Sequence, residues 1–376
     1  MKANVQESTI SGTVGPEDRR AVRALGANAR ALVLLALVLD VPLLSHAVRG
    51  LTREPRAHSV EVDGVPLELV RPAGRGPWPA FVFVTGAHPL RRNEPIVQRV
   101  AEGFARAGYL AVVPDLPGLG EGTISRGTRD AALSVVEWTQ SRDDVRGGRV
   151  ALCGASAGAS LALLVAEHPE LAGRISIVAA VCPFADLEKM LCLATTCRYE
   201  DDGRVESYEA AVLLRRVVAR SVVAALPSAA DREFLLDRIG DVTEDGRDPI
   251  HELRALEVGR LQPESRAVVE LLTNSDPGRF RELYDALPTE LHSLVDELSP
   301  LHRVGEIAAP VEFIGPPADP YFPGGETRAL AAGIADARVT VSPILDHTRP
   351  SLSLSLLGDF ARFRHFVVRT LADAAS

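Results

Sequence analysis

A serine set between glycines carries the clearest chemistry in this sequence. Ser156 is the centre of a Gly-x-Ser-x-Gly pattern that begins at Gly154 and ends at Gly158, with an apolar run before it (150–153) and a helix-forming run after it (159–166). Such a strand-to-helix turn strains the backbone of the serine and lifts its hydroxyl out at the edge of a sheet. The helix N-terminus behind it offers N–H groups and partial positive charge to a developing oxyanion. The pattern therefore predicts a nucleophilic serine, and the alternative is a turn of small residues without catalysis.

A serine hydroxyl becomes an effective nucleophile only when a base takes its proton and an acid orients that base. Of the nine histidines, His347 has the best position, because it follows a predicted strand (337–344) and precedes the last predicted helix. Asp319 follows the preceding predicted strand (310–315). Loops at the carboxyl ends of parallel strands meet at one edge of a sheet, so both side chains are predicted to lie near Ser156.

Other roles for these two residues stay open at this stage. Asp346 is an alternative acid, although adjacent residues in an extended loop usually point apart, which favours Asp319. Asp319 could also merely begin a turn before Pro320, and His347 could be an exposed loop residue.

The elements that would position these residues become readable from residue 58. Apolar and polar residues alternate on both sides of Asp63-Gly64, which predicts an antiparallel hairpin. Apolar strands then alternate with amphipathic helices and short Gly/Pro loops, which predicts an α/β fold with a mainly parallel sheet and helices on both faces. The predicted strands are 80–84, 110–114, one from 150, 175–181, 310–315 and 337–344, and the predicted helices are 95–107, 129–140, one to about 168, 327–334 and 356–371.

The strand pattern is interrupted after the sixth strand. Only amphipathic helical patterns are evident from 184 to 309, at 210–226, 229–239, 265–272 and 279–286. This stretch is too long for a connecting loop, so it is predicted to be a helical cap inserted in the sheet domain. The expected organisation is an N-terminal segment (1–57), a first part of the core (58–183), the cap (184–309) and a second part of the core (310–376).

The order Ser156, Asp319, His347 along the chain resembles that of the α/β-hydrolase family. The resemblance extends from about residue 58 to the C-terminus and covers the strand and helix order, the turn at Ser156, the inserted cap and both later loops. It is closest to bacterial esterase-like or dienelactone-hydrolase-like members. It implies Ser156 as nucleophile, His347 as general base and then acid, and Asp319 as the group that orients the imidazole.

The resemblance also indicates where an oxyanion would bind. One donor would be the backbone N–H of Ala157, and the other would come from the loop that follows the strand ending at Val84. Many family members have His-Gly at the start of this loop, whereas this chain has Thr85-Gly86. Ala87 is the preferred second donor, with Gly86 and His88 as alternatives; His88 could equally cap the following helix.

The most apolar run of the chain, 31–48, admits three interpretations. Arginines precede it, as at a membrane anchor, and Ser45-His46-Ala47 resembles a signal-peptide cleavage site. Asp40 within the run opposes insertion, which leaves a helix packed on the domain as the third interpretation. A membrane-associated or exported protein is the expectation, with a cytoplasmic protein as the alternative.

Composition excludes several classes of function. With 46% hydrophobic and 24% charged residues, the chain has the composition of a globular protein with a sizeable core. A net charge of −9 argues against a nucleic-acid partner. The spacing of His, Asp, Glu and Cys matches no metal site, so neither metal nor cofactor is expected. Four cysteines are too few for a disulfide framework, although Cys192 and Cys197 could form a local disulfide.

These observations predict a serine hydrolase that cleaves carboxylic esters of small molecules. Leu, Val and Ala on the helices of the cap favour an apolar pocket and therefore an uncharged ester. A peptidase or an acyltransferase would use the same residues. An inactive ligand-binding protein with the same fold is the alternative from another class.

Overall fold

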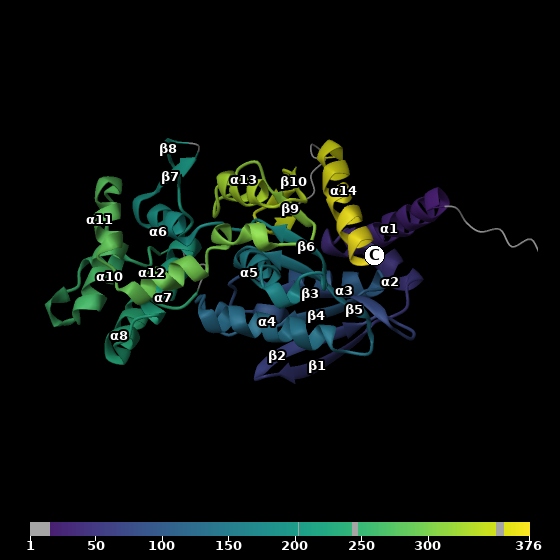
Figure 1. Cartoon of the computed structure of the whole chain (residues 1–376), viewed down its shortest axis with the longest axis horizontal. Helices are drawn as coiled ribbons and strands as arrows, with labels where there is room; N and C mark the ends of the chain where they lie inside the picture. Colours follow the sequence, from purple (N-terminus) through teal and green to yellow (C-terminus); the bar gives the residue numbers. More distant parts are fainter. Residues whose placement is uncertain (1–15, 202, 243–246, 351–356) are drawn as a thin grey trace, which may run out of the picture.

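The apolar strands predicted from residue 58 onward lie in one sheet of eight strands. In the computed structural model, which describes residues 16–201, 203–242, 247–350 and 357–376, their order is β1-β2-β4-β3-β5-β6-β9-β10 (Figure 1). β2 pairs antiparallel with β1 and β4, and all other neighbours in the sheet are parallel. The strands are β1 (Arg56–Val62), β2 (Val65–Arg71), β3 (Trp78–Val84), β4 (Leu110–Pro114), β5 (Val145–Ala155), β6 (Ile175–Val181), β9 (Val311–Gly315) and β10 (Ala337–Val341).

Helices cover both faces of this sheet, because its central strands are apolar on both sides. α4 (Arg126–Gln140) and α5 (Ala157–Ala166) pack on one face. α3 (Pro95–Arg106) and α14 (Leu357–Ala374) pack on the other. α13 (Gly324–Gly333) connects β9 to β10. The expected α/β architecture is therefore present, with a layer of helices on each side of the sheet.

Helices dominate the region between β6 and β9 and lie together at one end of the molecule (Figure 1). Arg126 at the start of α4 binds Glu297 of this region through two hydrogen bonds of 2.7 and 2.8 Å. The helices are α6 (Leu187–Thr196), α7 (Val212–Ala224), α8 (Ala229–Ile239), α9 (His251–Arg254), α10 (Pro263–Thr273), α11 (Phe280–Asp285) and α12 (Thr289–Glu297). Their assignment as a separate cap, with boundaries at 184 and 309, stays a prediction.

The expectation that this region contains no strands was wrong. β7 (Arg198–Asp201) and β8 (Arg204–Ser207) form a small antiparallel hairpin. Only Tyr199 among these eight residues is buried, so the sequence lacks the apolar alternation by which strands are recognised. A further pair of two-residue strands, β11 (Leu345–Asp346) and β12 (Arg349–Pro350), follows β10.

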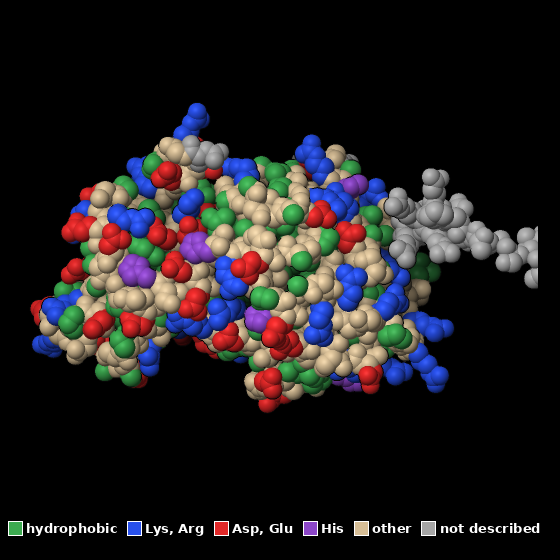
Figure 2. All heavy atoms as spheres, in the orientation of Figure 1, with side chains coloured by type: hydrophobic (Ala, Val, Ile, Leu, Met, Phe, Trp, Pro, Cys, Tyr) green, Lys and Arg blue, Asp and Glu red, His purple; other side chains and the backbone are tan. Residues whose placement is uncertain are grey.

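Short 3₁₀ helices complete the connections. They are η1 (Arg91–Asn93), η2 (Leu119–Glu121), η3 (Pro169–Leu171), η4 (Val258–Arg260), η5 (Pro277–Arg279), η6 (Pro300–His302) and η7 (Val304–Glu306). On the face shown in Figure 2, acidic and basic side chains are interspersed over the surface.

The apolar N-terminal run is divided between two helices. α1 (Pro16–Val38) ends before Asp40, whose φ is 48°, and α2 (Pro42–Leu51) begins at a proline, where a new helix starts readily. Among the described residues, no helix combines the length and apolarity that a membrane span requires. Residues 1–15 of the N-terminal segment lie outside the described part of the chain, and the membrane anchor or signal peptide stays a prediction.

α1 packs on the helical layer of α3 and α14, as the third interpretation of the sequence expects. Leu34 and Leu35 are buried there. Arg30 donates to the hydroxyl of Tyr109 (3.2 Å), which in turn donates to the carbonyl of Leu371 in α14 (2.6 Å). The helix is thus fixed to the domain by apolar contacts and by a buried tyrosine.

Candidate active site

Ser156 lies in the sharp turn between β5 and α5. Its φ of 55° and ψ of −130° are strained for a residue with a side chain, and its amide donates to the carbonyl of Val181 (2.8 Å). The flanking positions must be glycine, because there is no room for a Cβ atom at either of them. A Cβ at Gly154 would lie 2.3 Å from the carbonyl oxygen of Gly158, and one at Gly158 would lie 2.2 Å from that of Val84. The predicted nucleophile thus stands in the turn that the pattern implies.

Gly86 brings the neighbouring loop close to the serine. A Cβ at this position would lie 3.1 Å from the Cβ of Ser156 and 3.3 Å from the carbonyl oxygen of Ala155. The loop therefore passes directly beside the nucleophile, and its next residue, Ala87, lines the same cavity. Ala157, the other predicted oxyanion donor, is the first residue of α5 and also lines it. Both residues therefore border the cavity that holds Ser156, and their function as oxyanion donors stays a prediction.

The side chains of Asp319 and His347 are joined although 28 residues separate them. Nδ1 of His347 lies 2.8 Å from Oδ2 and 3.0 Å from Oδ1 of the carboxylate. Both residues are buried, and the amides of Tyr321 (2.7 Å) and Phe322 (3.1 Å) donate to Oδ1. These bonds fix the direction of the carboxylate and, with it, the tautomer and plane of the imidazole.

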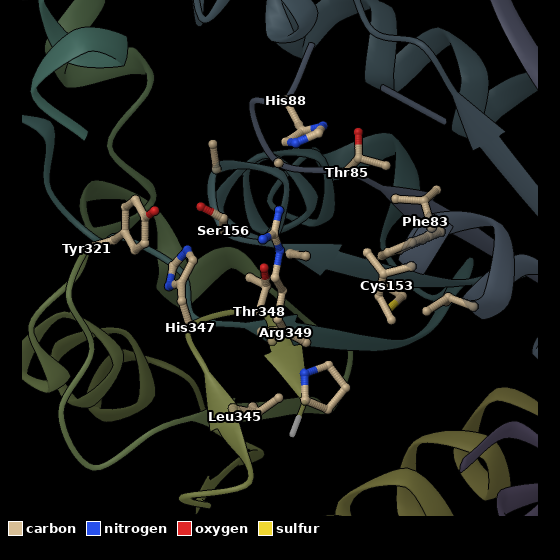
Figure 3. A pocket seen from close by; sticks show the side chains of 18 of the residues that line it. Phe83, Thr85, His88, Cys153, Ser156, Tyr321, Leu345, His347, Thr348 and Arg349 are labelled. Atoms are coloured by element: carbon tan, nitrogen blue, oxygen red, sulfur yellow. The ribbon is translucent and has the colours of Figure 1, made fainter. Parts of the chain in front are cut away.

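Electrostatics favour an ionised Asp319. Burial alone would raise its pKa, but the hydrogen bond and charge of His347 together with the two amides outweigh it, so the pKa of Asp319 lies below its ordinary value. The other ring nitrogen of His347, Nε2, is buried and has no hydrogen-bond partner among the described residues. In Figure 3 the imidazole lies beside Ser156. An unpartnered buried nitrogen is costly unless it serves a ligand or a reaction.

His347 reaches this position through a tight turn. It has a φ of 52° and lies at the tip of the hairpin formed by β11 and β12. The ring of Tyr321 packs against the imidazole at 4.3 Å between centroids, and that of Phe322 at 5.6 Å. Asp346, the alternative acid, is exposed, so the carboxylate on the imidazole is that of Asp319.

Cys182 lies next to Asp319 and His347. Its thiol donates to the carbonyl of His347 (3.1 Å), and burial, followed by the charge of Asp319, raises the pKa of this thiol well above its ordinary value. The possible ligand atoms of Cys182, Asp319 and His347 lie within 4.8 Å of one another. A protonated thiol and an imidazole nitrogen already bound to a carboxylate make this group a poor metal site. Cys192 and Cys197 are free, so the local disulfide considered above is not formed.

Ser156 and His347 face one cavity of about 390 Å³. On one side its walls are apolar side chains from α6 and α7, including Leu187, Met190 and Val217. This agrees with the expectation that helices of the inserted region border an apolar pocket. On the other side the cavity continues between the sheet and the layer of α1, α3 and α14.

Glu326 and the aromatic pair Tyr321 and Phe322 were not predicted. Glu326 is fully buried and accepts the amides of Ala185 (2.7 Å) and Asp186 (3.0 Å) and the hydroxyl of Tyr199 (2.8 Å). It fixes the chain where it leaves β6 for the helical region. Its partners are 127 to 141 residues away in sequence, so no local pattern reveals it, whereas the aromatic pair next to Asp319 was a readable signal.

Comparisons with known proteins agree with this fold. A model of the X-Pro dipeptidyl-peptidase (S15) family matches residues 63–214, which include Ser156 and end before Asp319 and His347. No curated protein sequence matches the chain.

Similar solved structures include the 2,6-dihydroxy-pseudo-oxynicotine hydrolase (14% identity, TM-score 0.49, covering 96% of this chain and 84% of that one). The Pyrococcus furiosus esterase PF2001 is 12% identical, with a TM-score of 0.46 and coverage of 86% and 92%. Est1E from Butyrivibrio proteoclasticus is 15% identical, with a TM-score of 0.47 and coverage of 84% and 99%.

The strand order with an antiparallel β2, the serine turn after β5 and the later loops that carry Asp319 and His347 are those of one fold. They give the chain the α/β-hydrolase fold, and the family-model match covers the part of that fold that holds Ser156.

Proposed function

We propose that the protein is a serine hydrolase that cleaves carboxylic esters through an acyl-enzyme on Ser156. The observation that carries this proposal is the hydrogen-bonded pair of Asp319 and His347, whose free Nε2 faces the same cavity as the strained serine. A nucleophile, a base and an orienting acid in this arrangement are what acyl transfer requires.

The reaction follows from the geometry. Nε2 of His347 takes the hydroxyl proton as Oγ of Ser156 attacks the ester carbonyl, and Asp319 stabilises the imidazolium. The oxyanion is bound by the N–H of Ala157 and by that of Ala87. His347 then gives the proton to the leaving alcohol, and a water molecule, activated in the same way, releases the acid and restores the serine. No hydrogen bond joins Ser156 to His347 among the described contacts, as is common before substrate binds.

The walls of the cavity favour an ester over a peptide. They are mostly apolar, and the charged lining residues Glu94 and Arg349 bind one another (3.4 Å), with His88 3.8 Å from Glu94. A peptide would bury N–H and C=O groups against these walls without partners, at a cost of about 1–3 kcal/mol each. An uncharged ester with apolar substituents carries fewer such groups.

A peptidase is the second candidate, because the matching family model describes X-Pro dipeptidyl-peptidases. Turnover of p-nitrophenyl esters should be compared with that of a dipeptide p-nitroanilide that has proline in second position. Release of nitroaniline at a rate comparable to that of nitrophenol would favour the peptidase.

The nucleophile is tested by covalent labelling. A fluorophosphonate probe should label the wild-type protein, and the modified peptide should contain Ser156. Ser156→Ala should abolish labelling, and Ser156→Ala and His347→Ala should each reduce ester hydrolysis by about 10⁴-fold or more. Ser134→Ala, at a half-buried serine of α4 that does not line the cavity, provides the matched control. Turnover retained by purified Ser156→Ala protein would refute the mechanism.

A further inference from the structure

The cavity at Ser156 has a second lobe that the inserted helices do not border. We call it the sheet lobe: it lies between the face of the sheet formed by Phe83, Cys153 and Ala179 and the helices α1, α3 and α14. The helices contribute Leu35, Val38, Val100, Phe104, Phe366 and Leu371.

Short side chains at the centre of the sheet create this space. On the face toward α1 and α14, β5 carries Cys153 and Ala155, and the neighbouring strand β6 carries Ala179 next to Cys153. The facing helices carry larger side chains, among them Phe104 and Phe366, which line the same cavity. The lobe thus runs inward from the edge where Ser156 lies, along the carboxyl ends of β5 and β6.

The chemistry of the sheet lobe is that of hydrocarbon. The polar side-chain groups on its walls are the thiol of Cys153, the hydroxyl of Thr85, which lies next to Phe83 in Figure 3, and the hydroxyl of Thr370, which has no hydrogen-bond partner among the described residues. Burial raises the pKa of Cys153 to about 12, so this thiol is neutral. The charged groups Glu94 and Arg349, which also line the cavity, form an ion pair of 3.4 Å, and in Figure 3 Arg349 lies between Ser156 and Cys153.

The position of His347 decides which half of an ester would occupy this lobe. His347 must give its proton to the leaving alcohol, so the alcohol leaves on the imidazole side of Ser156. In Figure 3 His347 lies on one side of Ser156, whereas Phe83 and Cys153 lie on the other. The acyl group of the acyl-enzyme therefore points toward the sheet lobe, and the alcohol lies toward α6 and α7.

We infer that the sheet lobe binds an unbranched, medium-length acyl chain, with the N-terminal helix α1 as one of its walls. This inference rests on the proposed function and adds the substrate class: esters of aliphatic acids rather than acetyl or aromatic acyl esters. It also gives the apolar stretch of α1 a role in the site, because Leu34, Leu35 and Val38 all line the cavity.

The test is a series of p-nitrophenyl esters from acetate through butyrate and octanoate to dodecanoate, with kcat/KM measured below their micelle concentrations. Each methylene buried in the lobe should raise kcat/KM by about fourfold until the lobe is full. Val38→Trp on α1 and Val100→Trp on α3 each place a large ring in the lobe. Both should lower the ratio of octanoate to acetate kcat/KM by about tenfold or more. Leu32→Trp, on the exposed side of α1, is the matched control and should leave this ratio unchanged.

A second measurement separates this inference from the proposed function. Binding of free dodecanoate to the wild-type protein and to Val38→Trp should be followed by displacement of a fluorescent fatty acid. Cleavage of acetate without a chain-length effect, or with a ratio that neither tryptophan variant changes, would overturn the inference and leave the hydrolase intact. Dodecanoate binding that Val38→Trp weakens, without cleavage of any ester, would support the lobe and refute the hydrolase. If no ester is cleaved and dodecanoate does not bind, both the hydrolase and the acyl-binding lobe are refuted.

Discussion

At the scale of single residues, the site depends on one carboxylate held in a fixed direction. Oδ1 of Asp319 accepts hydrogen bonds from two backbone amides and also contacts Nδ1 of His347. Neither the carboxylate nor the imidazole can therefore turn freely. The ring of Tyr321, tilted by 31° to the imidazole and 4.3 Å from it between centroids, limits the remaining motion of the imidazole. The base is therefore oriented before any substrate arrives, which lowers the cost of reaching the transition state.

Asp319→Asn should lower kcat for ester hydrolysis by about 10²–10⁴-fold, because the amide can hold the imidazole in the wrong tautomer and cannot stabilise the imidazolium. Steady-state kinetics with a p-nitrophenyl ester give the loss, and circular dichroism checks that the variant is folded. Asp346→Asn, on the exposed neighbour of His347, should change kcat by less than about threefold. A larger loss of kcat in Asp346→Asn than in Asp319→Asn would show that Asp346, and not Asp319, orients His347.

The residues of the site differ in how readily the sequence reveals them. The Gly-x-Ser-x-Gly pattern identifies Ser156 within five consecutive residues. Asp319 and His347 were identified because each follows a predicted strand. The choice between Asp319 and Asp346, by contrast, depends on how a two-residue hairpin turns, and this is a property of the folded chain. Cys182 and Glu326 were missed because their contacts join segments far apart in sequence.

At the scale of elements, Glu326 couples two parts of the chain. From α13 it holds the first residues after β6 and the start of the small hairpin β7–β8. Burial raises the pKa of Glu326, and the two amides and the hydroxyl of Tyr199 partly offset this effect. The helices that border the cavity therefore begin from a fixed point on the sheet.

Glu326→Gln should destabilise the protein by about 1.5–3 kcal/mol, because the NH₂ group of glutamine is itself a donor. It would replace one carboxylate oxygen and face either the two backbone amides or the hydroxyl of Tyr199, which would lose their acceptor. Tyr199→Phe removes only one of the three bonds and should cost about 1 kcal/mol. Urea unfolding followed by tryptophan fluorescence measures both free energies of unfolding. A Glu326→Gln variant as stable as the wild type would show that this carboxylate does not hold the junction.

The elements of the sheet were predictable because its strands are nearly continuous apolar runs bounded by glycine and proline. Strand and helix positions from the leading hairpin to α14 follow the predicted order, within a few residues at most ends. The hairpin β7–β8 was not predictable, since mostly exposed strands have no apolar face. The N-terminal run was ambiguous, because an apolar stretch that packs on a helical layer resembles one that enters a bilayer.

At the scale of the whole molecule, one buried acid should make stability depend on pH. Glu167 follows α5 and is 4% exposed, and burial raises its pKa from 4.5 to about 8. The folded state then keeps a proton that the unfolded state releases. Stability provided by this group is complete at low pH and is lost as the pH rises through its folded pKa.

The free energy of unfolding should therefore fall between pH 4.5 and about 8, by at most about 1.4 kcal/mol per pH unit from this residue. Glu167→Gln should flatten that dependence, and Glu170→Gln, three residues on and exposed, should retain it. Chemical denaturation at a series of pH values measures the slopes. Equal slopes in the wild type and Glu167→Gln would show that Glu167 is ionised in the folded protein.

The packing of α1 against α14 has a consequence for synthesis of the protein. Asn28 accepts a hydrogen bond from Arg364 (2.5 Å) across 336 residues of sequence, and Tyr109 binds Leu371 close to the C-terminus. The ribosome completes α14 more than 300 residues after α1, whereas α3, which also packs on α1, follows much sooner. The side of α1 that α14 covers therefore stays exposed in the nascent chain until α14 has been made, and exposed apolar surface of this kind favours aggregation.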